Sequence, residues 1–406
     1  MSLSMQHQKQ AQLSRNPLEP TASSGAFRDP HELCTFIQRN LNNALDVNGE
    51  TSYTNSFMIR LAGNDRGFLY LPNLPVSYSL DNHLYMKIYA ICSGILYPYK
   101  TLLPQTNAYF VPYDPEEPNL ARALFFPWVD GIPERLMIEN IDQFIATEVT
   151  SNRIPIMAKV TSNRIPIMAK VTSNRIPIMA NKVNLNMDNI VHLAVSGSSG
   201  SGKSKFTKYL IRCLNADSAT HLLLVDPKLS QIYKLGRELN LEVLSPTFGS
   251  NLNSFITEVN ELLGRVINKI YERQQKLLIN PTTRFSKIYV VIDELLALVQ
   301  GSSKQARDTF SQLLGTIALL GRETQVSLIL ISQRFDATAF GGNTAVREQI
   351  NCAIILGDIN TNTTQFLLPH ANIDHIVVPA GIGTGIIKFT DDQHNNHIMP
   401  LLTPTY

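Results

Sequence analysis

Residues 197–204 read GSSGSGKS, which matches the phosphate-loop pattern G-x-x-x-x-G-K-[ST]. The apolar run HLAVS precedes this segment and the helical pattern KFTKYLIRCLN follows it, so the strand and the helix that such a loop requires are both present. Glycines let successive backbone N–H groups point at phosphate oxygens, at the positive end of the following helix. We therefore predict a nucleotide site formed by eight residues: Gly197, Ser198, Ser199, Gly200, Ser201, Gly202, Lys203 and Ser204.

Two side chains of this loop are expected to act on the phosphates directly. Lys203 should reach the β- and γ-phosphates of ATP, and the Ser204 hydroxyl should ligate Mg²⁺. The alternative interpretation is a flexible linker rich in glycine and serine, and the flanking strand and helix patterns argue against it.

A pair of acids ends the apolar run in KIYVVIDELLAL, residues 287–298. Open α/β sheets bind ligands at the carboxyl ends of their strands, which is where Asp293 and Glu294 fall. Asp293 would hold Mg²⁺ through water, and Glu294 would orient or deprotonate the attacking water. Alternatively, the two acids are a helix N-cap and a first-turn charge. The pair favours ATP hydrolysis over phosphoryl transfer to a small molecule, because a kinase must exclude water.

Two further polar residues flank the run VSLILIS. Gln333 follows this run, so it is a candidate for sensing the γ-phosphate or positioning water. Arg322 lies at the end of the preceding helical pattern, from which it could reach a neighbouring subunit's nucleotide as an arginine finger. Its alternative role is a cation at a helix C-terminus.

Short apolar runs alternate with longer helical patterns after about residue 183, which predicts an α/β domain on a mostly parallel sheet. The strand candidates are Ile190–Val195, Leu222–Asp226, Leu241–Leu244, Ile288–Asp293, Ser327–Ser332, Ala353–Leu356 and Ile386–Phe389.

The loop and acid pair, together with LLLVDPK (222–228), YERQQKLL (271–278) and LILISQR (328–334), resemble the FtsK/SpoIIIE branch of the FtsK–HerA ATPases over roughly residues 185–390. Asp226-Pro227-Lys228 is the most discriminating of these motifs. The resemblance implies a RecA-like P-loop domain that forms a ring, usually a hexamer, and hydrolyses ATP at subunit interfaces to move DNA. It also implies a nucleotide and catalytic set with a γ-phosphate sensor and a trans finger: Lys203, Ser204, Asp293, Glu294, Gln333 and Arg322.

The sequence departs from the pattern of FtsK itself, because neither a membrane domain nor a winged-helix module is visible and Ala353 stands where relatives usually have Arg. The layout is more similar to the FtsK-type proteins of plasmids and conjugative elements. The expected function is an ATP-driven DNA translocase for transfer or maintenance, with DNA and possible relaxase or transfer-apparatus partners. The alternatives are a packaging or segregation motor, a non-motor nucleotide switch that works through residues 31–180, and a small-molecule kinase.

The rest of the chain divides into three predicted parts: a tail over 1–30, a smaller α+β domain over 31–148 and a linker over 149–182, before the motor domain at 183–406. Phe57–Leu61 and Phe68–Leu71 read as a β-hairpin. The apolar stretch Leu84–Tyr97 is too short to span a membrane and predicts a buried helix. With neither a signal peptide nor clustered cysteines, the expectation is a cytoplasmic protein without a membrane segment.

The linker contains VTSNRIPIMA three times with a period of 11 residues. Identical copies indicate a recent duplication, and a basic arm that touches DNA phosphates is the functional alternative. Residues 149–182 carry six cations and no acid, so subtracting six from the formal charge of +2 leaves −4 for the rest of the chain. This balance excludes a protein that coats DNA by bulk electrostatics. The six cations are Arg153, Lys159, Arg164, Lys170, Arg175 and Lys182.

Overall fold

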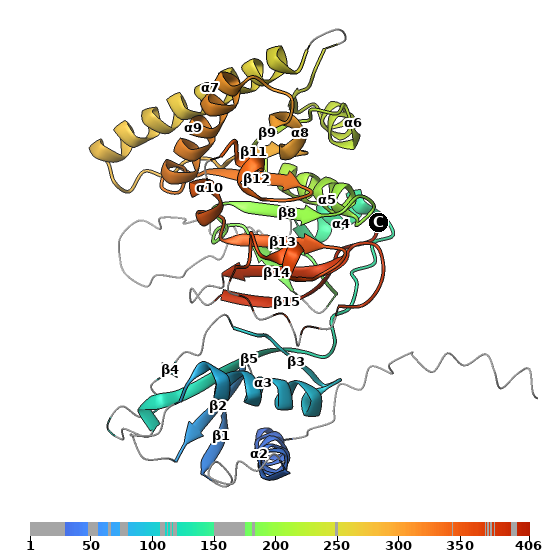
Figure 1. Cartoon of the computed structure of the whole chain (residues 1–406), viewed down its shortest axis with the longest axis vertical. Coiled ribbons are helices and arrows are strands. Elements are labelled where there is room, and N and C mark those ends of the chain that lie inside the picture. Colours follow the sequence, from blue (N-terminus) through green and yellow to red (C-terminus); the bar gives the residue numbers. More distant parts are fainter. Residues whose placement is uncertain are drawn as a thin grey trace, which may run out of the picture.

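The computed structural model describes residues 29–47, 56–63, 66–73, 80–105, 110–111, 113, 116, 120–149, 175–180, 183–247, 251–342, 344–369, 371, 373, 376, 378–390 and 396–406. The two larger of the three sheets in the described residues occupy opposite ends of the molecule, the eight-stranded one with its helices above the five-stranded one in Figure 1.

The larger sheet has eight strands in the order β10-β9-β11-β12-β8-β13-β14-β15. The first six are parallel, and β14 and β15 run antiparallel to their neighbours. This confirms the predicted α/β fold with a mostly parallel sheet. The strands are β8 (Leu193–Gly197), β9 (His221–Val225), β10 (Glu242–Leu244), β11 (Ile288–Ile292), β12 (Val326–Ser332), β13 (Cys352–Leu356), β14 (Thr384–Thr390) and β15 (Asn396–Leu402).

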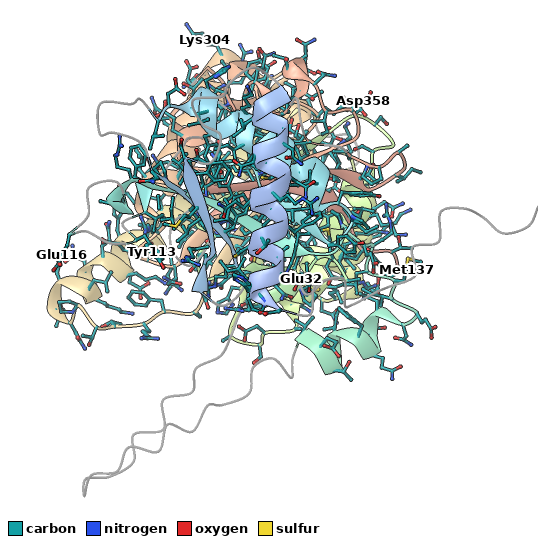
Figure 2. The ribbon with its side chains drawn as sticks, turned by 90° about the horizontal axis from the view of Figure 1, so that it is seen from below. Glu32, Tyr113, Glu116, Met137, Lys304 and Asp358 are labelled. Atoms are coloured by element: carbon teal, nitrogen blue, oxygen red, sulfur yellow. The ribbon has the colours of Figure 1, made fainter. Side chains whose placement is uncertain are left out.

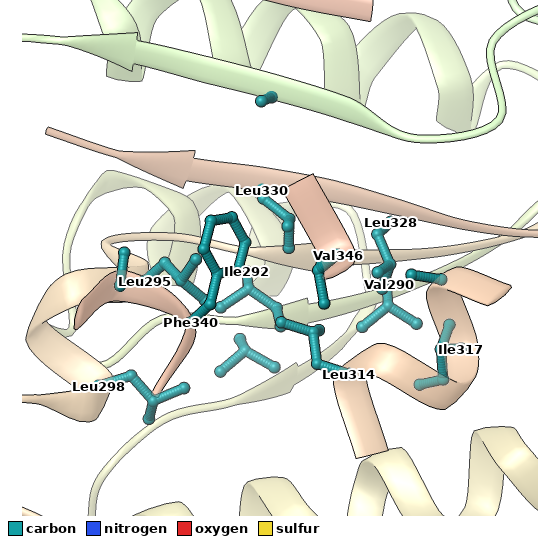
Figure 3. Close-up of a cluster of buried hydrophobic side chains, with 14 of the residues drawn as sticks. Val290, Ile292, Leu295, Leu298, Leu314, Ile317, Leu328, Leu330, Phe340 and Val346 are labelled. Carbon is teal, nitrogen blue, oxygen red and sulfur yellow. The ribbon is translucent and has the colours of Figure 1, made fainter. Parts of the chain in front are cut away.

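Helices cover both faces of this sheet because its strands are apolar on both sides. In β11, Val290 and Ile292 point to the core under α7 and α9, while Tyr289 and Val291 point to the core under α5 and α6. Figure 3 shows the first of these cores. The helices are α5 (Lys203–Asn215), α6 (Gln231–Glu238), α7 (Leu252–Ile279), α8 (Leu295–Val299), α9 (Lys304–Leu320), the 3₁₀ turn η4 (Ala337–Phe340), α10 (Ala345–Glu348) and α11 (Thr361–Thr364).

The smaller sheet is antiparallel, in the order β1-β2-β5-β3 with β4 also paired to β5. It confirms the predicted smaller α+β domain, and the register of β1 with β2 confirms the hairpin. Stacked aromatic rings fill its core. The ring centroid of Phe126 lies 4.8 Å from that of Phe68 and 4.4 Å from that of Tyr85. The elements are α2 (Pro30–Val47), β1 (Phe57–Leu61), β2 (Gly67–Pro72), α3 (Asn82–Leu96), β3 (Lys100–Leu102), β4 (Phe110–Val111), η2 (Leu120–Arg122) and β5 (Ala123–Asp130).

Two helices pack on this smaller sheet. Helix α3 contains most of the apolar stretch 84–97, and it buries Leu84, Ile88 and Cys92 in the domain core, as expected of a buried helix. Figure 2 shows α2 in front, with the exposed Glu32 near one end. Among the helices in the described segments, none is both long and apolar enough to cross a membrane.

The segment between the two sheets contains the third copy of the repeat. Its Arg175–Pro177 forms β6, which pairs with β7 (Asn184–Asn186), and Ile176 and Ile178 are buried in the core beside α5. One copy therefore provides the strand that leads into the larger α/β domain. Most of the first two copies lies outside the described residues, so the basic-arm alternative stays a prediction. Upstream lie α4 (Ile141–Phe144) and the π-helical turn η3 (Ile145–Val149).

The last strand, β15, was not predicted from the sequence. Its run NHIMPLL contains Pro400, and a proline within an apolar run argues against a central strand. The structure places β15 at the edge of the sheet, paired through β14 with Pro400 opposite Ile386. On its other side, within the described residues, β15 makes a single bridge between His397 and Gln105 and pairs with no further strand, so the proline is tolerated there.

Candidate nucleotide site

The phosphate loop connects β8 to α5 as the sequence pattern predicts. Gly197 ends the strand, and Gly202 occupies the N-cap position of α5 with φ of +101°. A Cβ at Gly202 would lie 2.9 Å from the backbone of Gly383, so both the conformation and the space require glycine. Glycine brings no capping side chain, which leaves the first N–H groups of the helix oriented toward an anion.

Lys203 is the first residue of α5, and its side chain folds back over the phosphate loop. Its buried ammonium group donates hydrogen bonds to the carbonyl oxygens of Gly197 at 2.5 Å and Ser198 at 2.9 Å. Burial lowers its pKa, while the nearby carboxylates of Glu294 and Asp293 act in the opposite direction. Ser204 follows in the first turn of α5 with an exposed side chain. The lysine is thus held at the loop within the electrostatic reach of both predicted acids.

Asp293 directly follows β11 and is almost completely buried. Its backbone N–H donates to the carbonyl oxygen of Val225 at 2.9 Å, which continues the pairing of β11 with β9. Burial raises the pKa of Asp293 to about 6, with the negative charges of Asp226 and Glu294 acting in the same direction. A carboxylate in such surroundings gains from a nearby cation, which fits the chemistry of a Mg²⁺ ligand.

Glu294 occupies the N-cap position of α8, but its side chain does not cap that helix within the described structure. Its backbone is left-handed, with φ of +46°, a conformation that is unfavourable for a non-glycine residue and often found at functional sites. Its carboxylate instead lies 3.3 Å from the ammonium group of Lys228. The alternative of a helix N-cap and a first-turn charge therefore finds no capping hydrogen bond from the Glu294 side chain.

The Asp-Pro-Lys triplet forms the connection from β9 to α6. The fully buried Asp226 accepts hydrogen bonds from the backbone N–H groups of Lys228 (3.0 Å), Ser230 (2.7 Å) and Tyr233 (2.9 Å). The Ser230 hydroxyl lies 2.8 Å from Asp226 Oδ2 and 3.3 Å from Asp293 Oδ2, linking this loop to the acid pair. The sequence motifs assigned no role to Asp226. Its signal was an aspartate at the start of a turn, a position that favours side-chain bonds to following N–H groups.

Gln333 and Arg322 lie at opposite ends of β12. Because β12 runs between β11 and β8, Gln333 emerges between the acids and the phosphate loop, and its carbonyl accepts a hydrogen bond from Ser196 Oγ at 3.3 Å. Arg322 is exposed in the turn before the strand. A seven-residue strand is about 23 Å long. Arg322 therefore lies far from the nucleotide site of its own subunit, and its role as a trans finger stays a prediction.

The turn before β14 holds the phosphate loop by a hydrogen bond, a contact that the sequence did not predict. The N–H of Gly383, just before β14, donates to the carbonyl oxygen of Ser201 at 2.8 Å. Arg135, from the segment that follows the smaller sheet, donates to the carbonyl oxygens of Ile382 and Thr403, both at 2.9 Å. The sequence signal was the glycine-rich run AGIGTG at 380–385, whose spacing matches no phosphate-loop pattern.

Within the described part of the chain, no group of three or more His, Cys, Asp or Glu side chains is arranged to hold a metal ion. Mg²⁺ in nucleotide sites is bound by one or two protein groups together with the phosphates. Ser204 and Asp293, on the loop and on the neighbouring strand end, are the residues that would contribute to such a site.

The family model for the central domain of helicase HerA matches residues 175–230, from β6 through the phosphate loop to the Asp-Pro-Lys triplet. No curated protein matches the chain. Residues 175–230 thus match a HerA-type ATPase domain, which agrees with the resemblance of the sequence motifs to the FtsK–HerA ATPases.

Several solved structures are similar at low sequence identity. The pCW3 conjugation coupling protein TcpA, in a monomer form with ATPγS, is 14% identical over 91% of this chain and 94% of its own, with a TM-score of 0.49. The cytoplasmic domain of the Thermomonospora curvata type VII secretion ATPase EccC is 23% identical over 57% of this chain and 28% of its own (TM-score 0.43). The DNA-packaging ATPase B204 from Sulfolobus turreted icosahedral virus is 15% identical over 53% of this chain and 98% of its own (TM-score 0.35).

Proposed function

We propose that the protein is an ATP-driven DNA translocase that assembles as a ring, with a hexamer as the expected form, and serves the transfer or maintenance of a plasmid or conjugative element from the cytoplasm. The supporting observation is the meeting of three strand ends at one edge of the sheet. Lys203 follows β8, Gln333 follows β12, and the acids Asp293 and Glu294 follow β11, with β12 in the middle. This arrangement suits hydrolysis of a γ-phosphate between a lysine and an activated water.

Each residue has a defined part in this proposal. The loop N–H groups and Lys203 bind the β- and γ-phosphates of ATP, and Ser204 and Asp293 hold Mg²⁺, which neutralises the charge that develops on the phosphates. Glu294 orients the attacking water and accepts its proton, and Gln333 contacts the γ-phosphate or that water. Arg322 would complete the site of the neighbouring subunit, which makes hydrolysis depend on ring assembly.

The repeat and the near-neutral charge fit a motor that contacts DNA locally. A ring that encloses DNA needs a small number of cations along its channel, so a body with a formal charge of −4 outside the linker is compatible with translocation. A relaxase or another component of a transfer apparatus would bring the DNA substrate to such a motor.

The test is ATP hydrolysis by the purified full chain with and without double- and single-stranded DNA. We expect DNA to stimulate hydrolysis. Lys203→Ala should lower the rate by at least about 100-fold, because it removes a positive charge aimed at the phosphates. Glu294→Ala should lower kcat similarly while ATP binding is retained. A rate that is the same with and without DNA would contradict the motor. ATP-dependent assembly without stimulated hydrolysis would instead support the non-motor switch.

A further inference from the structure

Lys228 is the last residue of the Asp226-Pro227-Lys228 motif. None of the catalytic roles proposed above involves it. Its Nζ lies 3.3 Å from Oε2 of Glu294, the residue that we assign to water activation. About half of the Lys228 side chain is exposed (48%), whereas Glu294 is largely covered (18%). The ammonium group thus approaches the carboxylate from the solvent side of the site.

The backbone that carries Lys228 is held by hydrogen bonds, and about half of its side chain is exposed to solvent. Asp226 accepts the N–H of Lys228 itself and that of Ser230, so the turn is anchored to a buried carboxylate. From this fixed point, the four-carbon stem of lysine can move its ammonium group by several ångströms. A half-exposed ion pair is also weak, so a more highly charged anion could replace the carboxylate as the partner of the ammonium group.

The position of Lys228 identifies that anion. Glu294 is paired with Lys228 and lies within electrostatic range of Lys203, whose ammonium group binds carbonyl oxygens of the phosphate loop. A triphosphate on the loop would place its γ-phosphate in this region, whereas a diphosphate would not extend as far. The charged groups around Lys228 are then the carboxylate of Glu294, the ammonium group of Lys203 and the terminal phosphate of ATP.

We propose that Lys228 is a positioning residue that detects the γ-phosphate. In the empty site Lys228 holds the carboxylate of Glu294, and when ATP binds, its ammonium group moves to the γ-phosphate and releases Glu294 to the attacking water. No bond other than hydrogen bonds and ion pairs changes in this exchange. The proposal rests on the proposed ATPase site and adds a link between nucleotide state and the freedom of the catalytic glutamate.

The first test compares the affinity of the full chain for ATPγS and for ADP, each with Mg²⁺, by calorimetry. Lys228→Met should weaken ATPγS binding about tenfold, since it removes a charge-assisted bond to the γ-phosphate, and should leave ADP affinity within about twofold. Lys228→Arg should restore most of the preference for ATPγS. Lys234→Met, which changes an exposed lysine on α6, is the matched control and should alter neither affinity.

The second test addresses the exchange of partners. In a Glu294→Gln background the ammonium group has no carboxylate to leave, so Lys228→Met should reduce ATPγS affinity by a larger factor there than in the wild-type chain. Equal factors in both backgrounds, or an unchanged ratio of ATPγS to ADP affinity for Lys228→Met, would overturn the proposal. Parallel losses for both nucleotides with a lowered melting temperature would do the same, because they indicate a structural role. Failure of the wild-type chain to hydrolyse ATP would contradict the proposed function and leaves these binding ratios measurable.

Discussion

The backbone N–H of Gly383 donates a hydrogen bond to the carbonyl oxygen of Ser201 at 2.8 Å, which ties the turn before β14 to the middle of the phosphate loop. Thr403, after β15, donates both its N–H (2.7 Å) and its hydroxyl (3.0 Å) to the carbonyl oxygen of Gly383. The antiparallel strands added to the parallel sheet thus serve as a support for the nucleotide site.

Substitution of this glycine is expected to damage the support. Gly383 has φ of +76°, and a Cβ there would clash with Thr403 Oγ1 and lie 3.0 Å from Arg135 Nη1. Gly383→Ala should lower the free energy of unfolding by about 1–3 kcal/mol and weaken ATPγS binding. Denaturant unfolding and calorimetry measure both. Gly94→Ala, at a helical position with open space around it, is the control and should be neutral or slightly stabilising. Equal effects of the two substitutions would contradict this account of the turn.

Arg135 should affect the nucleotide site from a distance. Arg135→Met removes the hydrogen bonds to the carbonyl oxygens of Ile382 and Thr403, at a cost of about 1–3 kcal/mol in unfolding free energy. Because these bonds hold the turn that contacts Ser201, the KM for ATP should rise while kcat changes little. Steady-state kinetics separates the two constants. Arg39→Met, on the exposed side of α2, provides the control. An unchanged KM in Arg135→Met would show that the turn does not depend on this arginine.

His192 should make folding stability depend on pH. It directly precedes β8. Its Nε2 lies 3.0 Å from the carbonyl oxygen of Ala318, and its Nδ1 accepts a hydrogen bond from the N–H of Leu328 at 3.0 Å. Burial lowers the pKa of His192 from 6.5 to about 4, and protonation would also break the bond at Nδ1.

The sign follows from a folded-state pKa below the unfolded one. The contribution of His192 to stability is fully present above about pH 6.5 and is lost as the pH falls toward 4, by about 3 kcal/mol in total. Denaturant unfolding at several pH values should show the wild-type chain losing its stability advantage over His192→Asn across this window. A difference between the two chains that stays constant with pH would rule out this role.

The repeat offers a test that separates duplication from function. The third copy forms β6, which lies against η3, so one copy can span the connection. Deletion of residues 149–170 should therefore leave the unfolding midpoint nearly unchanged. If the deleted cations neutralise DNA phosphates, the slope of log affinity against log salt should become less steep by about 0.9 for each phosphate that is no longer neutralised. An unchanged slope supports a duplication without a role in DNA binding, and a strongly destabilised chain would contradict the assignment of β6.

The local parts of this site were predictable, and its long-range contacts were not. The phosphate loop and the strands ending in Asp293 and Gln333 follow from apolar runs and motif spacing, which are properties of neighbouring residues. The pairing of Lys228 with Glu294 joins residues 66 positions apart, and it depends on β9 lying beside β11. The contact of Gly383 with the phosphate loop likewise depends on β14 and β15. Strand β15 was not predicted, because Pro400 lies within its apolar run.

The central claim is that ATP hydrolysis moves this protein along DNA, and displacement of a protein roadblock from DNA tests it most directly. The wild-type chain should remove streptavidin from a biotinylated duplex with ATP, while ATPγS should not support removal. Glu294→Ala should bind ATP and leave the streptavidin in place. Hydrolysis of ATP by the wild-type chain without any displacement, on either duplex or single-stranded DNA, would contradict the account.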